Sequence, residues 1–565
     1  MRALVSTLLL LSLGSVGGQT ARADEAPLAP EAVAAQVEAA HAAADAAKVA
    51  EWASKDAPDP WLVADALLAS GARQAAEAFA KAAPRKDVER LPELVARWKA
   101  TDGDAAARLA IQAGNVALQA QKPADALTAF DAAQGQATPV IAVRLLHGQG
   151  LALLRLERPA NAASRFGEVV TLAEQLGWLA RMAAALDNLA WAELAAKRPE
   201  AAVAAARRRV ELETARGNRT RTADAHRLVG HLESERGGND AAIAALEQAL
   251  AMYEDLADPA GVGRTRNDLA EALLKKRDYT RAEREILGAL GKVEPIGLWP
   301  EVARSHALMG MLYRTQRKGP AWATLAITSY ERALEAAVKT GEAPRIAGLN
   351  IELGRCYGAR DEQGDQEKAL TYHLRAVQLF EGLGNRPGAG AALRNAADSN
   401  ARLGRDDVAQ EQAERVVVLA RELGDAELEG QGHQLLGELA ERQKKPEQAL
   451  AAYTAAVARF EAAGDRVEAA RCVAGAAEAL RLLGDLPKAR EHADRAAKEA
   501  GALRDRGVAS YAGLVGARIR RDQGLREEAL MTARDALGLY RSLKNPLGIA
   551  ETEALIKELE AAPPR

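Results

Sequence analysis

The sequence predicts an all-α protein built as an α-solenoid, a stack of antiparallel helix pairs. Its 565 residues are too many for one ordinary hydrophobic core. Only 4 % of them are aromatic, and Ala, Leu, Glu and Arg are abundant, which favours helices over strands. A pattern of small and apolar residues also recurs along most of the chain at a spacing close to 40 residues. Such a period is typical of repeat proteins in which each unit packs on the next.

One repeat unit, between Asp224 and Asp258, shows the pattern most clearly. Two helical stretches flank a turn at Gly237 and Gly238, and the first stretch carries a small residue, Gly230, on its apolar face. In the second stretch, apolar residues recur with the period of a helix that buries one face: Ala242, Leu246, Ala249, Leu250 and Tyr253. Neither stretch is apolar enough to stand alone, so each is expected to pack against its partner and the next pair.

Residues equivalent to Gly230 occur eleven times, at spacings of 36 to 44 residues, and we call them the anchors. All of them are Gly or Ala: Gly114, Gly150, Ala190, Gly230, Ala270, Gly310, Gly354, Ala397, Gly437, Ala477 and Ala517. An alanine follows each anchor, twelve residues later in most units and slightly later in two units with insertions: Ala126, Ala162, Ala202, Ala242, Ala282, Ala326, Ala369, Ala409, Ala449, Ala489 and Ala529.

Close helix packing explains why these positions are small. Where two helices cross within about 8 Å, only Gly or Ala leaves room for the facing backbone. The anchor and the alanine that follows it therefore predict the crossing point within each pair. A third position, seven residues further on, is alanine in eight of the eleven units. Arg209 occupies it in one unit, which predicts a locally looser junction there.

These units resemble the tetratricopeptide repeat over roughly residues 104 to 545. Gly437, followed by Ala449, Tyr453 and Ala456, matches that family's small residue in the first helix and its alanines and aromatic residue in the second. The spacing exceeds the family's common period of about 34 residues and is similar to that of a subclass with longer helices. The resemblance implies a right-handed superhelix that binds segments of other proteins and has no catalysis or cofactor of its own.

The domain organisation follows from these boundaries. Residues 1–23 have a positive Arg2, a leucine-rich apolar stretch and a small-residue cleavage pattern ending at Ala23, which predicts a signal peptide. We expect export, with a periplasmic or secreted location after cleavage near Ala23. Residues 24–103 are expected to form a helical region with a degenerate repeat, 104–545 the array of about eleven helix pairs, and 546–565 a capping helix and tail. No later segment is long and apolar enough to suggest a transmembrane helix.

The sequence offers no basis for an enzyme. No metal, phosphate-binding or nucleophile motif occurs, so we predict no catalytic residue, no metal site and no cofactor. His226 and His231 are five residues apart and do not share one face of a helix, so they are poorly placed to bind one metal ion together. Cys356 and Cys472 each lie inside a helical pattern, as small buried residues do. Basic residues (75) and acidic residues (78) nearly balance, which argues against a nucleic-acid partner.

The resemblance also implies where a partner would bind. In the family, five positions of each first helix face a ligand on the concave side. In this chain those positions hold sixteen basic and nine acidic residues, and all but one of the basic residues are arginine. Arginine suits bidentate recognition of carboxylates, so we expect an acidic or C-terminal extended peptide. The expected peptide-binding residues are Arg227, Arg264, Asn267, Arg304, Arg314, Arg355, Arg394, Arg402, Arg442 and Arg471.

Other interpretations stay open at this point. The arginines could reflect only that Arg is this chain's usual cation. The array could regulate a separately encoded peptidase or signalling enzyme. It could also be a structural protein of the cell envelope that associates with glycans, although the expected ligand face has few aromatic residues besides Trp191 and Tyr511.

Overall fold

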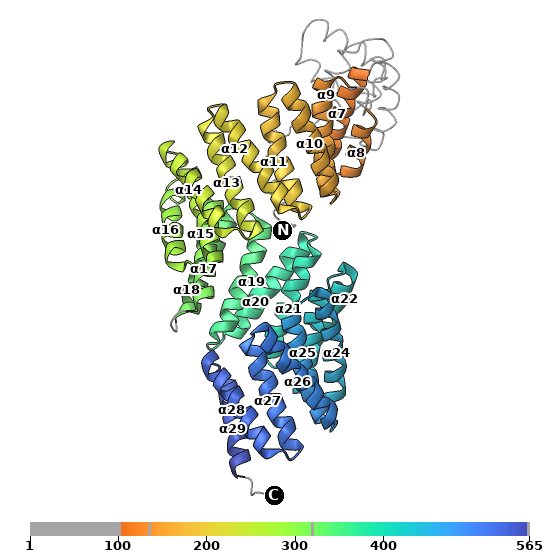
Figure 1. Cartoon of the computed structure of the whole chain (residues 1–565), viewed down its shortest axis with the longest axis vertical. Coiled ribbons are helices and arrows are strands. Elements are labelled where there is room, and N and C mark those ends of the chain that lie inside the picture. Colours follow the sequence, from red (N-terminus) through yellow and green to blue (C-terminus); the bar gives the residue numbers. More distant parts are fainter. Residues whose placement is uncertain (1–102, 134–136, 318–320, 562–565) are drawn as a thin grey trace, which may run out of the picture. The chain divides into compact units, whose positions relative to one another are not determined.

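The computed structural model describes residues 103–133, 137–317 and 321–561 (Figure 1). The expected signal peptide (1–23) and residues 24–102 of the expected N-terminal region lie outside these ranges. Every regular element in the described ranges is an α-helix, which confirms the all-α class. None of the described helices is both long and apolar enough to cross a membrane.

The described helices fall into two compact parts. The helices of the first part are α7 (Gly103–Gln119), α8 (Pro123–Asp131), α9 (Pro139–Arg155), α10 (Pro159–Gln175), α11 (Leu179–Ala195), α12 (Pro199–Ala215), α13 (Arg219–Arg236), α14 (Asn239–Asp255), α15 (Pro259–Lys276) and α16 (Tyr279–Val293).

The second part contains thirteen described helices. They are α17 (Trp299–Gln316), α18 (Trp322–Thr340), α19 (Ala343–Arg360), α20 (Asp365–Gly382), α21 (Arg386–Arg402), α22 (Asp406–Leu423), α23 (Ala426–Arg442), α24 (Pro446–Ala463), α25 (Arg466–Leu482), α26 (Leu486–Leu503), α27 (Arg506–Asp522), α28 (Arg526–Leu543) and α29 (Pro546–Ala561).

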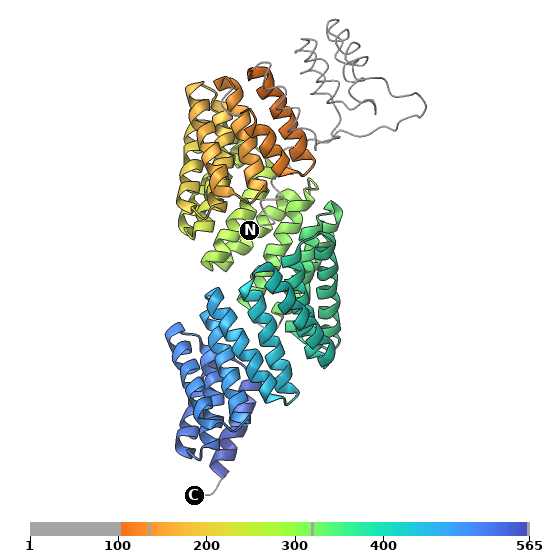
Figure 2. The ribbon, with the colours of Figure 1, turned by 90° about the vertical axis from the view of Figure 1, so that its right-hand side faces the viewer.

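Within each part, consecutive helices lie side by side and alternate in direction, as the ribbons show from two sides (Figures 1 and 2). Odd-numbered helices are the first helices of the pairs and carry the anchors, and even-numbered helices are the second helices. First helices of successive pairs also touch, as α25 and α27 do. This arrangement confirms the solenoid of antiparallel helix pairs.

The anchors lie where the sequence predicts, at the crossing of each pair. A Cβ atom added to Gly437 would come within 2.7 Å of the Tyr453 ring, and one added to Gly114 within 2.4 Å of the Phe130 ring. Such distances are far inside van der Waals contact, so only glycine fits opposite these rings. Cys356 and Cys472 are buried and unbridged, as expected for small apolar side chains.

The turns between successive pairs show why each helix ends and the next begins. Gly424 ends α22 with a φ of 66°, a left-handed conformation that glycine adopts without strain. Asp425 then caps α23 by accepting a hydrogen bond from the Leu428 amide at 3.0 Å. The same glycine and Asp or Asn sequence joins α20 to α21 and α24 to α25.

Arg209 departs from the sequence-based expectation of a loose junction. Its side chain is buried, with only 5 % of the residue exposed, and its guanidinium lies 2.5 Å from the Asp187 carboxylate of α11. The junction is therefore packed, because the first helix of the pair supplies a counter-charge for the buried cation.

Candidate functional site

The ten expected peptide-binding residues all lie on first helices, from α13 to α25. We call the surface formed by these helices in either part the first-helix face. Asn267 is fully buried, so it does not offer its amide to a ligand at this surface. The nine arginines are half-buried or exposed, and a ligand can reach them from solvent.

Most of these arginines already have a carboxylate partner within the chain. Seven of the nine form an ion pair at 4.0 Å or less: Arg227 with Asp268, Arg304 with Glu301, Arg314 and Arg355 with Glu352, Arg402 with Asp398, Arg442 with Asp406, and Arg471 with Glu468. A ligand carboxylate would have to compete with an internal one at each of these positions.

Two arginines differ from the other seven. Neither Arg264 of α15 nor Arg394 of α21 forms an ion pair with any described residue. The Arg394 guanidinium makes only a long contact of 3.4 Å with the Asn395 side-chain oxygen, and its Nε is buried without a hydrogen bond. The first-helix face of each part thus has one of these arginines without an ion pair to a described residue.

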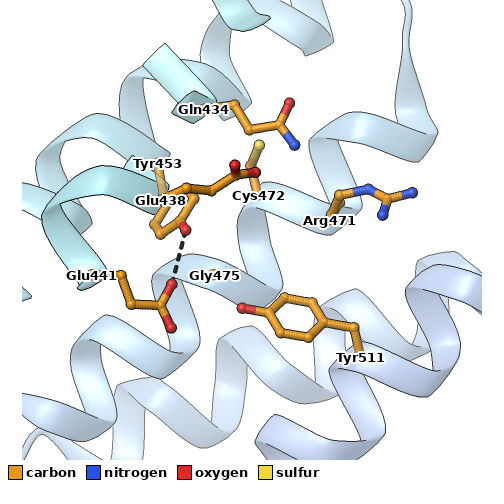
Figure 3. Close-up of a pocket in the computed structure, with 8 residues that line it drawn as sticks. All are labelled: Gln434, Glu438, Glu441, Tyr453, Arg471, Cys472, Gly475 and Tyr511. Atoms are coloured by element: carbon orange, nitrogen blue, oxygen red, sulfur yellow. Dashed lines mark hydrogen bonds between the residues drawn. The ribbon is translucent and has the colours of Figure 1, made fainter. Parts of the chain in front are cut away.

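A hollow of about 280 Å³ lies on this face in the second part (Figure 3). Three first helices and one second helix contribute its walls. Its lining residues are Gln434, Glu438, Glu441, Tyr453, Arg471, Cys472, Gly475 and Tyr511. A Cβ atom on Gly475 would meet the Tyr453 ring at 2.8 Å, so the missing side chain is what lets this ring stand in the wall.

Two carboxylates dominate the chemistry of the hollow. Glu441 accepts a hydrogen bond of 2.9 Å from the Tyr453 hydroxyl, and Glu438 lies one helical turn before it. Glu438 is open to solvent at the mouth, yet the surrounding helices screen much of its water. This loss of hydration, and then the nearby Asp398 carboxylate, raise the pKa of Glu438 to about 7, while Arg394 opposes the shift. Loss of hydration also raises the pKa of Glu441.

The other lining groups have no acid–base or nucleophilic function that the geometry supports. Burial raises the pKa of the Cys472 thiol far above its usual range, so it is not a reactive thiolate. No group of His, Cys, Asp and Glu among the described residues could hold a metal ion.

The buried residues shared by the helix pairs match the pattern that the tetratricopeptide resemblance predicts. In the described pairs, a Gly or Ala anchor of the first helix packs on the second helix, and the alanines that follow are buried. The chain thus has the fold of a tetratricopeptide-type α-solenoid.

Comparison with known proteins adds no closer relationship. No protein-family model and no curated protein sequence matches the chain. Similar solved structures include a Cut9–Hcn1 hetero-tetramer of the APC/C, at 12 % identity over 99 % of each chain with a TM-score of 0.38. Yeast Tom70 shows 13 % identity over 80 % of this chain and 96 % of its own, with a TM-score of 0.37.

A third similar structure is aspartyl phosphate phosphatase F from Bacillus subtilis. It shows 12 % identity over 70 % of this chain and 96 % of its own, with a TM-score of 0.41. At such low TM-scores, these likenesses do not indicate what this tetratricopeptide-type chain binds.

The tetratricopeptide pattern placed five of the eight lining residues on the ligand face, and of these the sequence analysis chose only Arg471 as a peptide-binding residue. Glu438, Glu441 and Tyr511 all occupy ligand-face positions. The signal that could have identified them is the pair of acids three residues apart on one helix face. What the sequence did not reveal is that neither Glu438 nor Glu441 forms an ion pair with a described residue.

Proposed function

We propose that this chain is a non-catalytic scaffold that binds an extended segment of another protein on its first-helix face. The observation that carries the proposal is that Arg264 and Arg394 form no ion pair with a described residue, on a face where the other expected arginines do. A carboxylate of the bound segment would form a bidentate charge-assisted interaction with either one, without displacing an internal partner. The segment would thus carry acidic side chains or a terminal carboxylate.

The first prediction concerns these two arginines. The mature chain, residues 24–565, serves as bait for proteins of the envelope fraction, beside the variants Arg264→Glu, Arg394→Glu and the double variant. We expect the double variant to lose its partner, with capture reduced by about tenfold or more, because each guanidinium–carboxylate interaction contributes roughly 1.5–3 kcal/mol. The single variants report which part of the array makes the larger contribution.

A matched control uses two arginines of second helices. Arg284 of α16 and Arg332 of α18 are exposed and form no ion pair with described residues. The variant Arg284→Glu/Arg332→Glu makes the same change in net charge away from the first-helix face, and it should capture as much partner as the unmodified chain. Equal capture by both double variants would sink the assignment to the first-helix face.

We also propose that the chain is exported and cleaved near Ala23. The support is the short apolar stretch and the Ala21-Arg22-Ala23 pattern at the start of the sequence. N-terminal sequencing of the protein recovered from the envelope fraction should start at or near Asp24. A protein that starts at Met1 would contradict export by this route.

A further inference from the structure

We propose that His373 makes the junction of α19, α20 and α21 sensitive to acid: protonation of its ring opens this junction, while helices far along the second part stay packed. This sensitivity belongs to the fold itself, so it does not depend on the proposed function. It adds a response to pH that the arginines of the first-helix face do not provide.

His373 occupies the central position of a helix crossing. It lies on α20 and faces Gly354, the anchor of α19, where an added Cβ atom would clash with the imidazole ring. At this position, the other ten pairs have a buried residue without a charge near neutral pH: Phe130, Phe166, Ala206, Leu246, Ile286, Tyr330, Ala413, Tyr453, Ala493 and Ala533. Among these eleven residues, only His373 gains a positive charge as the pH falls.

The hydrogen bonds of His373 suit a neutral ring. The residue is only 4 % exposed, and its Nδ1 lies 3.0 Å from the Oγ of Ser399 on α21. The Ser399 hydroxyl donates its single proton to the Asn395 carbonyl at 3.1 Å, so its oxygen accepts a hydrogen bond from the Nδ1–H group. The neutral ring then holds a lone pair at Nε2, which is buried and has no hydrogen-bond partner among the described residues. A proton added at Nε2 would create a buried charged donor without an acceptor.

The groups around the ring do not compensate this cost. Loss of hydration lowers the pKa of His373 to about 4, and the Arg355 guanidinium of α19 acts in the same direction. The Asp398 carboxylate of α21 and the carbonyls of Ile351 and Asn395 favour the charged ring, but burial outweighs them. The residues of α20 three and four positions away from His373 are apolar: Ala369, Leu370, Ala376 and Val377.

The direction of the pH dependence follows from the two states of the ring. The pKa of His373 is about 4 in the packed junction, and its ordinary value, expected once the junction opens, is 6.5. Between these pH values the open state binds more protons than the packed state, so packing is most favourable above about pH 6.5 and weakens as the pH falls toward 4. We expect the equilibrium constant for opening to rise by about tenfold or more from pH 7 to pH 5.

The same junction carries part of the first-helix face. Arg355 lies on α19 and Arg394 on α21. Opening of the junction in acid would displace Arg394 from its position and release a segment bound through it. This release, unlike the acid sensitivity itself, rests on the proposed function.

The test measures amide hydrogen exchange of the mature chain at pH 7 and pH 5 by mass spectrometry. Each exchange rate is divided by the intrinsic rate at the same pH, which leaves the protection that the structure provides. Protection of α19, α20 and α21 should fall by about tenfold or more from pH 7 to pH 5. Helices α27 and α28 contain no histidine and should keep their protection, so they serve as the internal reference.

Two variants remove the titratable ring. His373→Phe provides the side chain that faces the anchors Gly114 and Gly150, and His373→Leu the one that faces Gly230. In both variants Ser399 keeps its hydrogen bond to a backbone carbonyl of its own helix, so no new unpaired donor arises. Protection of α19, α20 and α21 should then be equal at the two pH values.

A matched control changes a histidine outside the junction. His492 of α26 is half-buried, and His492→Gln should leave the acid sensitivity of α19, α20 and α21 as it is in the unmodified chain. Equal protection of the unmodified chain at pH 7 and pH 5 would overturn the proposal. So would a loss of protection in acid that persists in His373→Phe and His373→Leu.

A second measurement decides the case in which neither variant folds at pH 7, as judged by circular dichroism. Exchange of the carbon-bound hydrogen of the His373 ring, followed by mass spectrometry, reports the pKa of this ring in the unmodified chain. A pKa of about 6 or above would overturn the acid-sensitive junction, and a lower value would support it. Capture of a partner through Arg264 and Arg394 at pH 7 affects neither result, so the proposed function succeeds or fails separately.

Discussion

At the residue scale, the residue that faces an anchor depends on whether the anchor is glycine or alanine. Glycine anchors face bulky residues of the second helix: Phe130, Phe166, Leu246, Tyr330, His373 and Tyr453. Four alanine anchors face alanines that share their core clusters, as Ala397 and Ala413 do. Ala270 is the exception, since Ile286 lies at the corresponding position. The total volume at a crossing is therefore kept within limits while its composition varies.

This matching predicts coupling between Gly437 and Tyr453. Gly437→Ala places a methyl group against the ring and should cost about 1–3 kcal/mol by overpacking. Tyr453→Ala leaves a cavity and should cost roughly 3–5 kcal/mol. The double variant recreates the Ala–Ala crossing found at Ala397, so its cost should be at least about 1 kcal/mol below the sum of the two. Urea unfolding followed by circular dichroism measures all three, and additive costs would contradict the matching.

At the element scale, the helices depend on capped turns as well as on their apolar faces. Gly424 in its left-handed conformation stops α22, and the Asp425 carboxylate satisfies an amide in the first turn of α23. Several other turns hold a residue other than glycine in the same conformation, among them Ala257 at a φ of 51° and Lys197 at 61°. The fold thus tolerates some strain at these turns.

Loss of the Asp425 cap should destabilise the chain. Asp425→Ala removes the acceptor of the Leu428 amide, and we expect a cost of about 1 kcal/mol. Asp425→Asn keeps an acceptor and should change stability by only a few tenths of a kcal/mol. Both variants are compared by urea unfolding. A cost for Asp425→Asn equal to that for Asp425→Ala would show that the carboxylate's charge, and not its hydrogen bond, stabilises the turn.

The same elements show how much the sequence could predict. The anchors and the Gly-Asp turns are local patterns, because Gly437 faces a residue sixteen positions later and Asp425 caps its own helix. Ion pairs, in contrast, could not be predicted from local patterns. Arg314 pairs with Glu352, and Arg442 with Asp406, across separate repeats, and side-chain length and rotamer decide such partners. Periodicity assigns a face to each residue, but it does not say which cation reaches which carboxylate.

At the scale of the whole molecule, stability is distributed along the array. The extensive contacts among the described helices join neighbours in the chain or first helices of successive pairs. A helix pair is thus stabilised by the pairs beside it and has little direct effect on distant ones.

Hydrogen exchange can test this local character. Gly437→Ala should speed amide exchange in α23 and α24, where the added methyl group disrupts packing, and to a smaller extent in α22 and α25. Helices α17 and α18 of the same compact part should keep their protection. Exchange is measured by mass spectrometry at matched times. A uniform increase in the exchange rate from α17 to α29 would show instead that the second part opens as one cooperative unit.

The internal ion pairs of the first-helix face affect how the proposed ligand would bind there and how its affinity would depend on salt. A ligand carboxylate that reaches Arg402 or Arg442 must replace Asp398 or Asp406, so one contact is exchanged for another of the same kind. Much of the electrostatic gain cancels in such an exchange. Added salt weakens the original pair and its replacement together, so affinity at these positions should respond less to ionic strength than on an open basic surface. In the proposed binding reaction, these positions would select a ligand by geometry more than by charge.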